Sequence, residues 1–70
     1  MELVQAHKIY NDEHPVGVIA LWDDGHVTLC LGDKEGNGTC YTTSKPMGEG
    51  VYHAALALLV LLGHKTVKAD

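Results

Sequence analysis

Residues 16–31 read VGVIALWDDGHVTLCL, two apolar runs joined by a short polar segment. Asp24-Gly25 between such runs is a strong signal for a β-hairpin, because the favoured two-residue turn needs positive φ angles that glycine adopts without strain. A turn at these two residues decides which side chains of the two strands face each other. On one face the predicted cross-strand pairs are Trp22 with Val27, Ala20 with Leu29 and Val18 with Leu31.

This register gives the two faces of the hairpin different roles. We predict that the face described above packs into the core, since all its residues are apolar. The other face carries Ile19 and Leu21 and is too apolar to be comfortable in water. We therefore expect a covering element or a partner protein over Ile19 and Leu21.

The segments on either side of the hairpin supply two further strands and a helix. Leu3–Tyr10 has the mixed polar and apolar pattern of an exposed edge strand. Thr39–Thr43 is rich in β-branched residues, which favours a fourth strand. A helix is expected from about Glu49 to Leu62, with Gly63 ending it in the left-handed conformation that glycine favours.

These segments predict an α+β fold with a four-stranded antiparallel β-meander followed by one C-terminal helix packed on the sheet (ββββα). A chain of 70 residues has room for one domain. We assign residues 1–65 to a single compact domain and residues 66–70 to a short C-terminal tail.

The two cysteines, Cys30 and Cys40, leave the register of the fourth strand open. A five-residue loop from Asp33 to Asn37 places them opposite each other, whereas a tight turn at Asn37-Gly38 does not. The first residues lack the basic stretch and apolar core of a signal peptide, so we expect a cytoplasmic protein with free thiols.

The charged residues argue against several classes of partner. The net charge is −4, and the basic residues are five scattered lysines with no arginine. Nucleic-acid binding draws on clustered positive charge and on the guanidinium group, so a nucleic-acid partner is not expected. The longest apolar run, from Val51 to Leu62, is too short for a bilayer span of about 20 residues, and no membrane association is expected.

The predicted helix is apolar almost all round. Tyr52, Ala55 and Leu59 lie on one broad face together with Val51, Leu58 and Leu62, and we expect this face to cover the sheet. The weaker face is bordered by small and apolar residues instead of a polar stripe. We therefore predict self-association, most simply as a homodimer, with an oligomer interface at Ala54, Ala57 and Leu61 or at the sheet face of Ile19 and Leu21.

Metal binding and catalysis find little support in the sequence. The five histidines have no ligand-pair spacing, and residues 33–38 resemble the start of a calcium loop whose twelfth position is Ser44 instead of a bidentate glutamate. Ser44 is the only serine, and neither cysteine has a neighbour that would activate it. We expect no enzyme activity, no metal and no cofactor.

One segment predicts a small-ligand site. Lys45 lies just before the expected start of the helix, where free N–H groups and the helix dipole favour an anion. Gly48 and Gly50 would allow the ligand to come close to the backbone. A small-anion or nucleotide-binding protein that sequesters its ligand is therefore the alternative function.

The preferred function is binding of another protein. A meander brings the two loops at 11–15 and 32–38 to one end of the sheet, so that four carboxylates form an acidic edge. Its residues are Asp12, Glu13, Asp33 and Glu35. Such an edge suits a partner with a basic surface, with Ile19 and Leu21 adding apolar contact. We predict a small non-catalytic inhibitor, of the kind that phages use against host defence enzymes.

Overall fold

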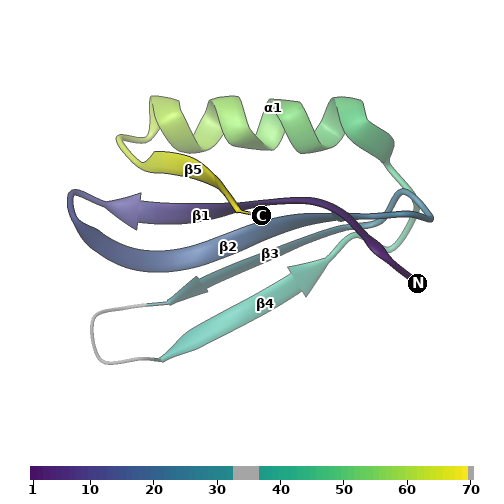
Figure 1. Cartoon of the computed structure of the whole chain (residues 1–70), viewed down its shortest axis with the longest axis horizontal. Helices are drawn as coiled ribbons and strands as arrows, with labels where there is room; N and C mark the ends of the chain where they lie inside the picture. The colour runs from purple at the N-terminus through teal and green to yellow at the C-terminus, as the bar shows by residue number, and fades with distance from the viewer. Residues whose placement is uncertain (33–36, 70) are drawn as a thin grey trace.

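A computed structural model of the chain describes residues 1–32 and 37–69, which form five strands and one helix (Figure 1). In chain order these are β1 (Leu3–Asn11), β2 (His14–Trp22), β3 (Val27–Gly32), β4 (Gly38–Thr42), α1 (Gly48–Leu61) and β5 (Lys65–Ala69). The strands form one antiparallel sheet in the order β4-β3-β2-β1-β5. The predicted α+β class and antiparallel meander are confirmed, but the number of strands is five instead of four.

The additional strand corrects the prediction of a C-terminal tail. After α1 the chain turns back at Gly63 and runs as β5 beside β1, with Thr66 opposite Ile9 and Lys68 opposite His7. β1 therefore lies inside the sheet and is not the edge strand that its mixed pattern suggested. The predicted order ββββα becomes ββββαβ.

The central hairpin has a turn one residue longer than predicted. Trp22 and His26 flank it, because the Trp22 N–H donates to the His26 carbonyl at 3.0 Å and the Gly25 N–H donates to the Trp22 carbonyl at 2.9 Å. Three residues, Asp23 to Gly25, thus make the turn, and Gly25 has the positive φ of 91° that such a turn requires at its last position. The strand register is therefore Leu21 opposite Val27, not Trp22 opposite Val27.

This shift of one residue exchanges the two faces of β2, whereas Val27 and Leu29 of β3 stay on the core face as predicted. Ile19 is fully buried and Leu21 is 6% exposed, whereas Val18, which was expected in the core, is 38% exposed. Of the two covers expected over Ile19 and Leu21, the covering element is confirmed, because α1 packs on this face. The two side chains are therefore not available for the predicted apolar contact with a partner. The core is made of Ile9, Ile19, Leu21, Val27, Tyr52 and Leu59.

The helix ends as the sequence predicts and begins without a side-chain cap. The Gly63 N–H donates to the Val60 carbonyl and the His64 N–H to the Leu59 carbonyl, both at 3.0 Å, and Gly63 has a φ of 94°. This is the glycine-dependent Schellman ending, which confirms Gly63 as the stop signal. No helix in the described part of the chain is long and apolar enough to cross a membrane.

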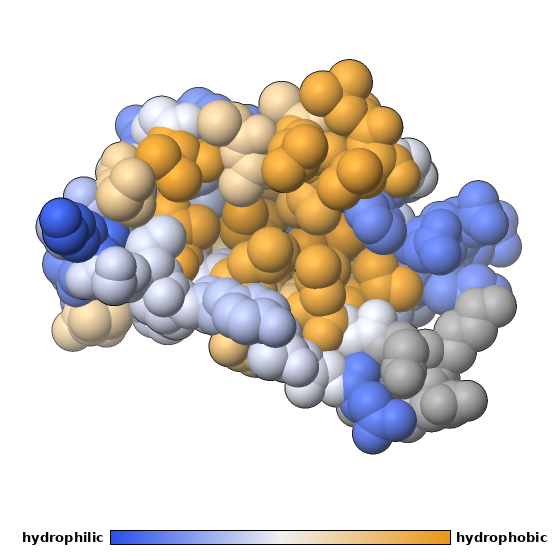
Figure 2. All heavy atoms as spheres, turned by 180° about the vertical axis from the view of Figure 1, so that it is seen from behind, coloured by the Kyte–Doolittle hydropathy of each residue, from blue (hydrophilic) through white to orange (hydrophobic). Residues whose placement is uncertain are grey.

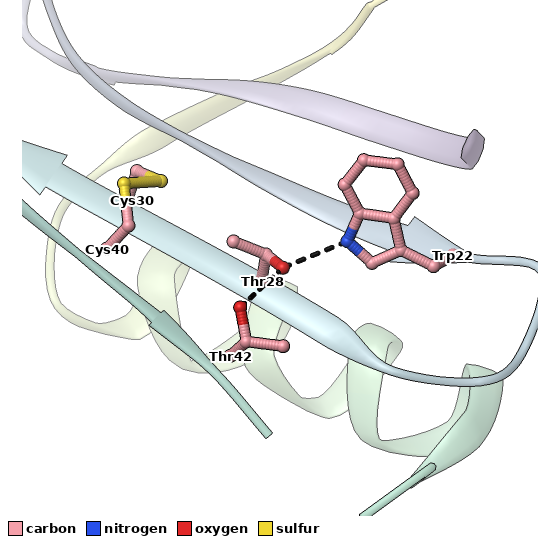
Figure 3. Close-up of a disulfide and its surroundings, with 5 residues drawn as sticks. All are labelled: Trp22, Thr28, Cys30, Cys40 and Thr42. Atoms are coloured by element: carbon pink, nitrogen blue, oxygen red, sulfur yellow. Dashed lines mark hydrogen bonds between the residues drawn. A yellow bond between two sulfur atoms is a disulfide. The ribbon is translucent and has the colours of Figure 1, made fainter. Parts of the chain in front are cut away.

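The sheet face turned away from α1, here called the open face, carries a disulfide bond (Figure 3). Gly32 lies opposite Gly38, so the loop between them has five residues and Cys30 faces Cys40. The two sulfur atoms are bonded, with the Cα atoms 4.0 Å apart. The expectation of free thiols is wrong. The cytoplasmic location was argued from the first residues of the chain and stays a prediction.

Candidate functional site

One tyrosine anchors α1 to the sheet. Tyr52 is fully buried, and its hydroxyl lies 2.7 Å from His7 Nδ1 and donates to the Ile19 carbonyl at 3.3 Å. Burial raises the pKa of Tyr52, so the phenol stays neutral. Burial also lowers the pKa of His7, with smaller contributions from Lys68 and His53. Both shifts favour the uncharged pair in the folded state.

Beside this anchor the helix leaves part of the sheet uncovered. Figure 1 shows α1 above β5 and β1, with β4 at the far side of the sheet. Between α1 and β3–β4 lies an apolar groove of about 270 Å³. Tyr41 on β4 is 66% exposed, although it faces Leu29 on the neighbouring strand. The groove is lined by Ile19, Val27, Leu29, Tyr41, Thr42, Thr43, Val51 and Ala55.

The flank of α1 that continues from this groove is apolar and exposed. Leu58 is 56% exposed and Leu62 is 66% exposed, and Val51 is also accessible to solvent. Figure 2 shows that the apolar residues form a continuous surface that runs from α1 down to the sheet. We call the set of Leu31, Tyr41, Val51, Leu58 and Leu62 the apolar surface.

The structure buries and exposes different helix residues from those predicted. Among the helix residues only Tyr52 and Leu59 are buried, so the expectation that Val51, Leu58 and Leu62 cover the sheet is wrong. Ala54, Ala57 and Leu61, the predicted oligomer interface, are exposed, with Leu61 at 82%. They face outward, next to the apolar surface. Sequence reasoning missed Tyr41 and the groove, because they depend on how far one helix extends over the sheet.

The acidic edge is described in part. Asp12 and Glu13 are exposed in the β1–β2 turn, and Figure 1 shows this turn at the same end of the molecule as the end of β3 and the start of β4. Asp33 and Glu35, the other two residues of the predicted edge, lie outside the described residues. Asp12 and Glu13 border a shallow hollow of about 310 Å³, which Tyr10, Lys65 and Val67 complete.

The helix N-terminus is partly occupied by the chain itself. The Gly48 N–H donates to the Gly25 carbonyl at 2.9 Å, so the Asp23–Gly25 turn lies against the start of α1. The Gly48 N–H is therefore not free to bind an anion. Gly50 has open space around it, and Lys45 is exposed. The structure thus leaves the predicted anion site accessible but with one backbone donor fewer.

Two histidines pair with carboxylates close to them in the sequence. His26 Nδ1 lies 2.9 Å from Asp24 Oδ2. The hydrogen bond from the His26 N–H is the largest cause that lowers the pKa of Asp24. His53 Nε2 lies 3.8 Å from Glu49 Oε1, one helical turn away. Within residues 1–32 and 37–69, no group of three or more His, Cys, Asp or Glu side chains could hold a metal ion.

Comparison with protein-family models, with curated proteins and with solved structures finds no match to this chain.

Proposed function

We propose that this protein is a small non-catalytic binding module that inhibits a partner protein by covering a basic surface on it. The observation that carries the proposal is the hollow at the acidic edge. There, Asp12 and Glu13 lie exposed beside the ring of Tyr10. Two carboxylates next to an aromatic ring suit a lysine or arginine side chain, through charge attraction and cation–π contact.

Lys65 lines the same hollow and gives the proposal a sharp internal control. Its positive charge opposes the binding of a partner cation, since like charges repel in the same way that the carboxylates attract. Removing this lysine should strengthen partner capture, and reversing the two carboxylates should abolish it. A surface that merely keeps the protein in solution would respond to neither change.

The test is affinity capture from the lysate of the native host with four versions of the protein. We expect bands captured by the wild type to disappear with Asp12→Lys/Glu13→Lys and to strengthen with Lys65→Gln. Glu49→Lys is the matched control, because it reverses an exposed carboxylate at the start of α1 and should leave capture unchanged. An identical capture profile for all four proteins would refute the proposal.

A host defence enzyme is the class of target that we propose for such an inhibitor. Short acidic chains without catalytic residues are typical of the phage proteins that inhibit such enzymes. The captured bands should therefore include an enzyme whose activity falls when the purified protein is added. Capture that leaves the enzyme's activity unchanged would exclude inhibition.

Sequestration of a small anion is the second candidate. It is favoured by the start of α1, which has no side-chain cap and has open space at Gly50. A thermal-shift screen with phosphorylated metabolites and nucleotides tests it, since a ligand at 100 times its Kd adds about 2.7 kcal/mol of stability. A shift that Lys45→Ala removes would support this function, and no shift with any anion would exclude it.

A further inference from the structure

We propose that a second copy of this chain binds to the apolar surface and its groove, forming a symmetric dimer in which the two α1 helices lie side by side. In this dimer, the helix of each chain covers the part of the other chain's sheet that the other chain's own helix leaves open. This interface is separate from the acidic edge, so it stands or falls independently of the proposed inhibitor function.

The exposed area of the chain supports a dimer interface of standard size. The accessible surface is 4845 Å² for a mass of 7.5 kDa. A compact monomer of this mass exposes about 4,200 Å², which leaves an excess of about 600 Å². One partner in a standard protein–protein interface buries about 800 Å². The excess is therefore close to what one side of a stable dimer covers.

The shape of the surface fits a copy of itself. Val51, Leu58 and Leu62 are spaced by seven and four residues, so they form one ridge along the exposed flank of α1. The groove of about 270 Å³ runs beside this ridge, between α1 and β3–β4. A two-fold symmetric interface needs one patch that carries both a projecting and a receiving part, and ridge and groove supply them.

The chemistry of the surface favours a partner without charges at the contact. None of the five residues of the apolar surface is charged, which matches the composition of interface cores. Each chain carries a net charge of −4, so two copies repel each other over long distances. Apolar burial must then supply the affinity, and added salt should strengthen the dimer by screening this repulsion. An interface held by ion pairs would weaken in salt.

Sedimentation equilibrium of the full chain, from low micromolar to submillimolar concentration, tests the proposal. We expect the wild type to dimerise and Leu58→Glu to weaken dimerisation about a hundredfold, because each substitution occurs twice in a symmetric interface. Leu3→Glu is the matched control: Leu3 is 54% exposed, against 56% for Leu58, but it lies opposite Trp22 on another part of the sheet. This control should dimerise like the wild type.

Each result decides for or against the interface. A wild type that remains monomeric overturns the proposal, and so does a dimer that persists in Leu58→Glu, since the contact would then lie elsewhere, for example along the edge strand β4. If circular dichroism shows that Leu58→Glu does not fold, Leu62→Gln at a 66% exposed position takes its place. Asp12→Lys/Glu13→Lys should dimerise normally, which separates this test from that of the inhibitor function.

Discussion

The two halves of the sheet are built from similar residues but end in different environments. Where α1 lies over β1 and β2, Ile9 and Ile19 are fully buried. On the same side of the sheet, Leu31 at the end of β3 is 36% exposed and Tyr41 on β4 is 66% exposed. Strand composition therefore does not decide burial in this protein. The position of the covering helix does.

Geometry explains why one helix is not enough. Five strands spaced at about 4.8 Å make a sheet about 19 Å wide, whereas a helix with its side chains is about 10 Å wide. A single helix thus covers about two strand spacings. The part of the sheet farthest from α1 needs another cover, and the disulfide between Cys30 and Cys40 links its outermost strand, β4, to β3.

The largest expected difference lies between Tyr52 on α1 and Tyr41 on β4. Tyr52→Ala should lower the free energy of unfolding by about 3–5 kcal/mol, because it opens a cavity under α1. Tyr41→Ala should change the stability of the dilute monomer by less than about 0.5 kcal/mol, since its side chain is mostly exposed. Urea unfolding at low protein concentration measures both. Equal losses would show that β4 is covered within the monomer.

The disulfide should be the next largest contribution. The cysteines are 10 residues apart, and closing a loop of this size stabilises by about 2–3 kcal/mol through the unfolded state. Reductant should therefore lower the urea midpoint of the wild type. The double variant Cys30→Ser/Cys40→Ser should start from this lower midpoint and show no response to reductant. A reductant effect in the double variant would point to a cause other than the disulfide.

Two glycines with positive φ angles should differ by a smaller amount. Gly63→Ala should cost about 1 kcal/mol, because a Cβ there meets only the backbone penalty of φ 94°. Gly25→Ala has a similar φ of 91° and in addition brings its Cβ to 3.1 Å from Pro46 Cβ, so we expect a larger loss. Thermal unfolding of both variants gives the comparison. A smaller loss for Gly25→Ala would contradict the contact between the hairpin turn and the start of α1.

The smallest expected effect is a pH dependence of stability that arises at His7, in the half of the sheet covered by α1. The pKa of His7 is lowered below its ordinary value of 6.5, so the unfolded chain binds more protons at this site than the folded one near that pH. The contribution of His7 to stability is therefore complete above pH 6.5 and is lost as the pH falls through the folded pKa. An NMR titration should place the His7 midpoint below 6.5.

The variant His7→Gln isolates this effect from the other histidines. The stability difference between the wild type and this variant should grow as the pH rises from about 5 to about 7, in line with proton linkage. A difference that stays constant, or that shrinks with rising pH, would contradict the lowered pKa.

Local signals in the sequence were sufficient to predict the central hairpin and the end of the helix. Gly63 predicted the end of the helix, and the Asp-Gly turn predicted the hairpin, because both depend on the backbone freedom of a single glycine. The register failed since Gly25 closes a three-residue turn instead of a two-residue one. That one residue was enough to exchange Ile19 and Leu21 with Val18 and Trp22 between the faces.

Long-range pairing explains the other errors. The segment 65–69 is short and carries two lysines, so its own sequence does not predict a strand. Their partner β1 lies more than fifty residues away in the sequence. The candidate surfaces follow the same rule: Leu61 was identified from helix periodicity alone, but the role of Tyr41 depends on the order of the strands. The acidic edge follows from the meander, which the sequence did predict, but Asp33 and Glu35 lie outside the described residues, so the edge as a whole stays a prediction.

The most direct test of the account is an isotope-filtered NMR experiment on a mixture of labelled and unlabelled chains. If a second copy covers the uncovered part of the sheet, the Tyr41 ring protons of one chain should show contacts with the Leu58 and Leu62 methyl groups of the other. A dimeric sample without these contacts, or with contacts from Val18 and Trp22 on the open face instead, would contradict the account.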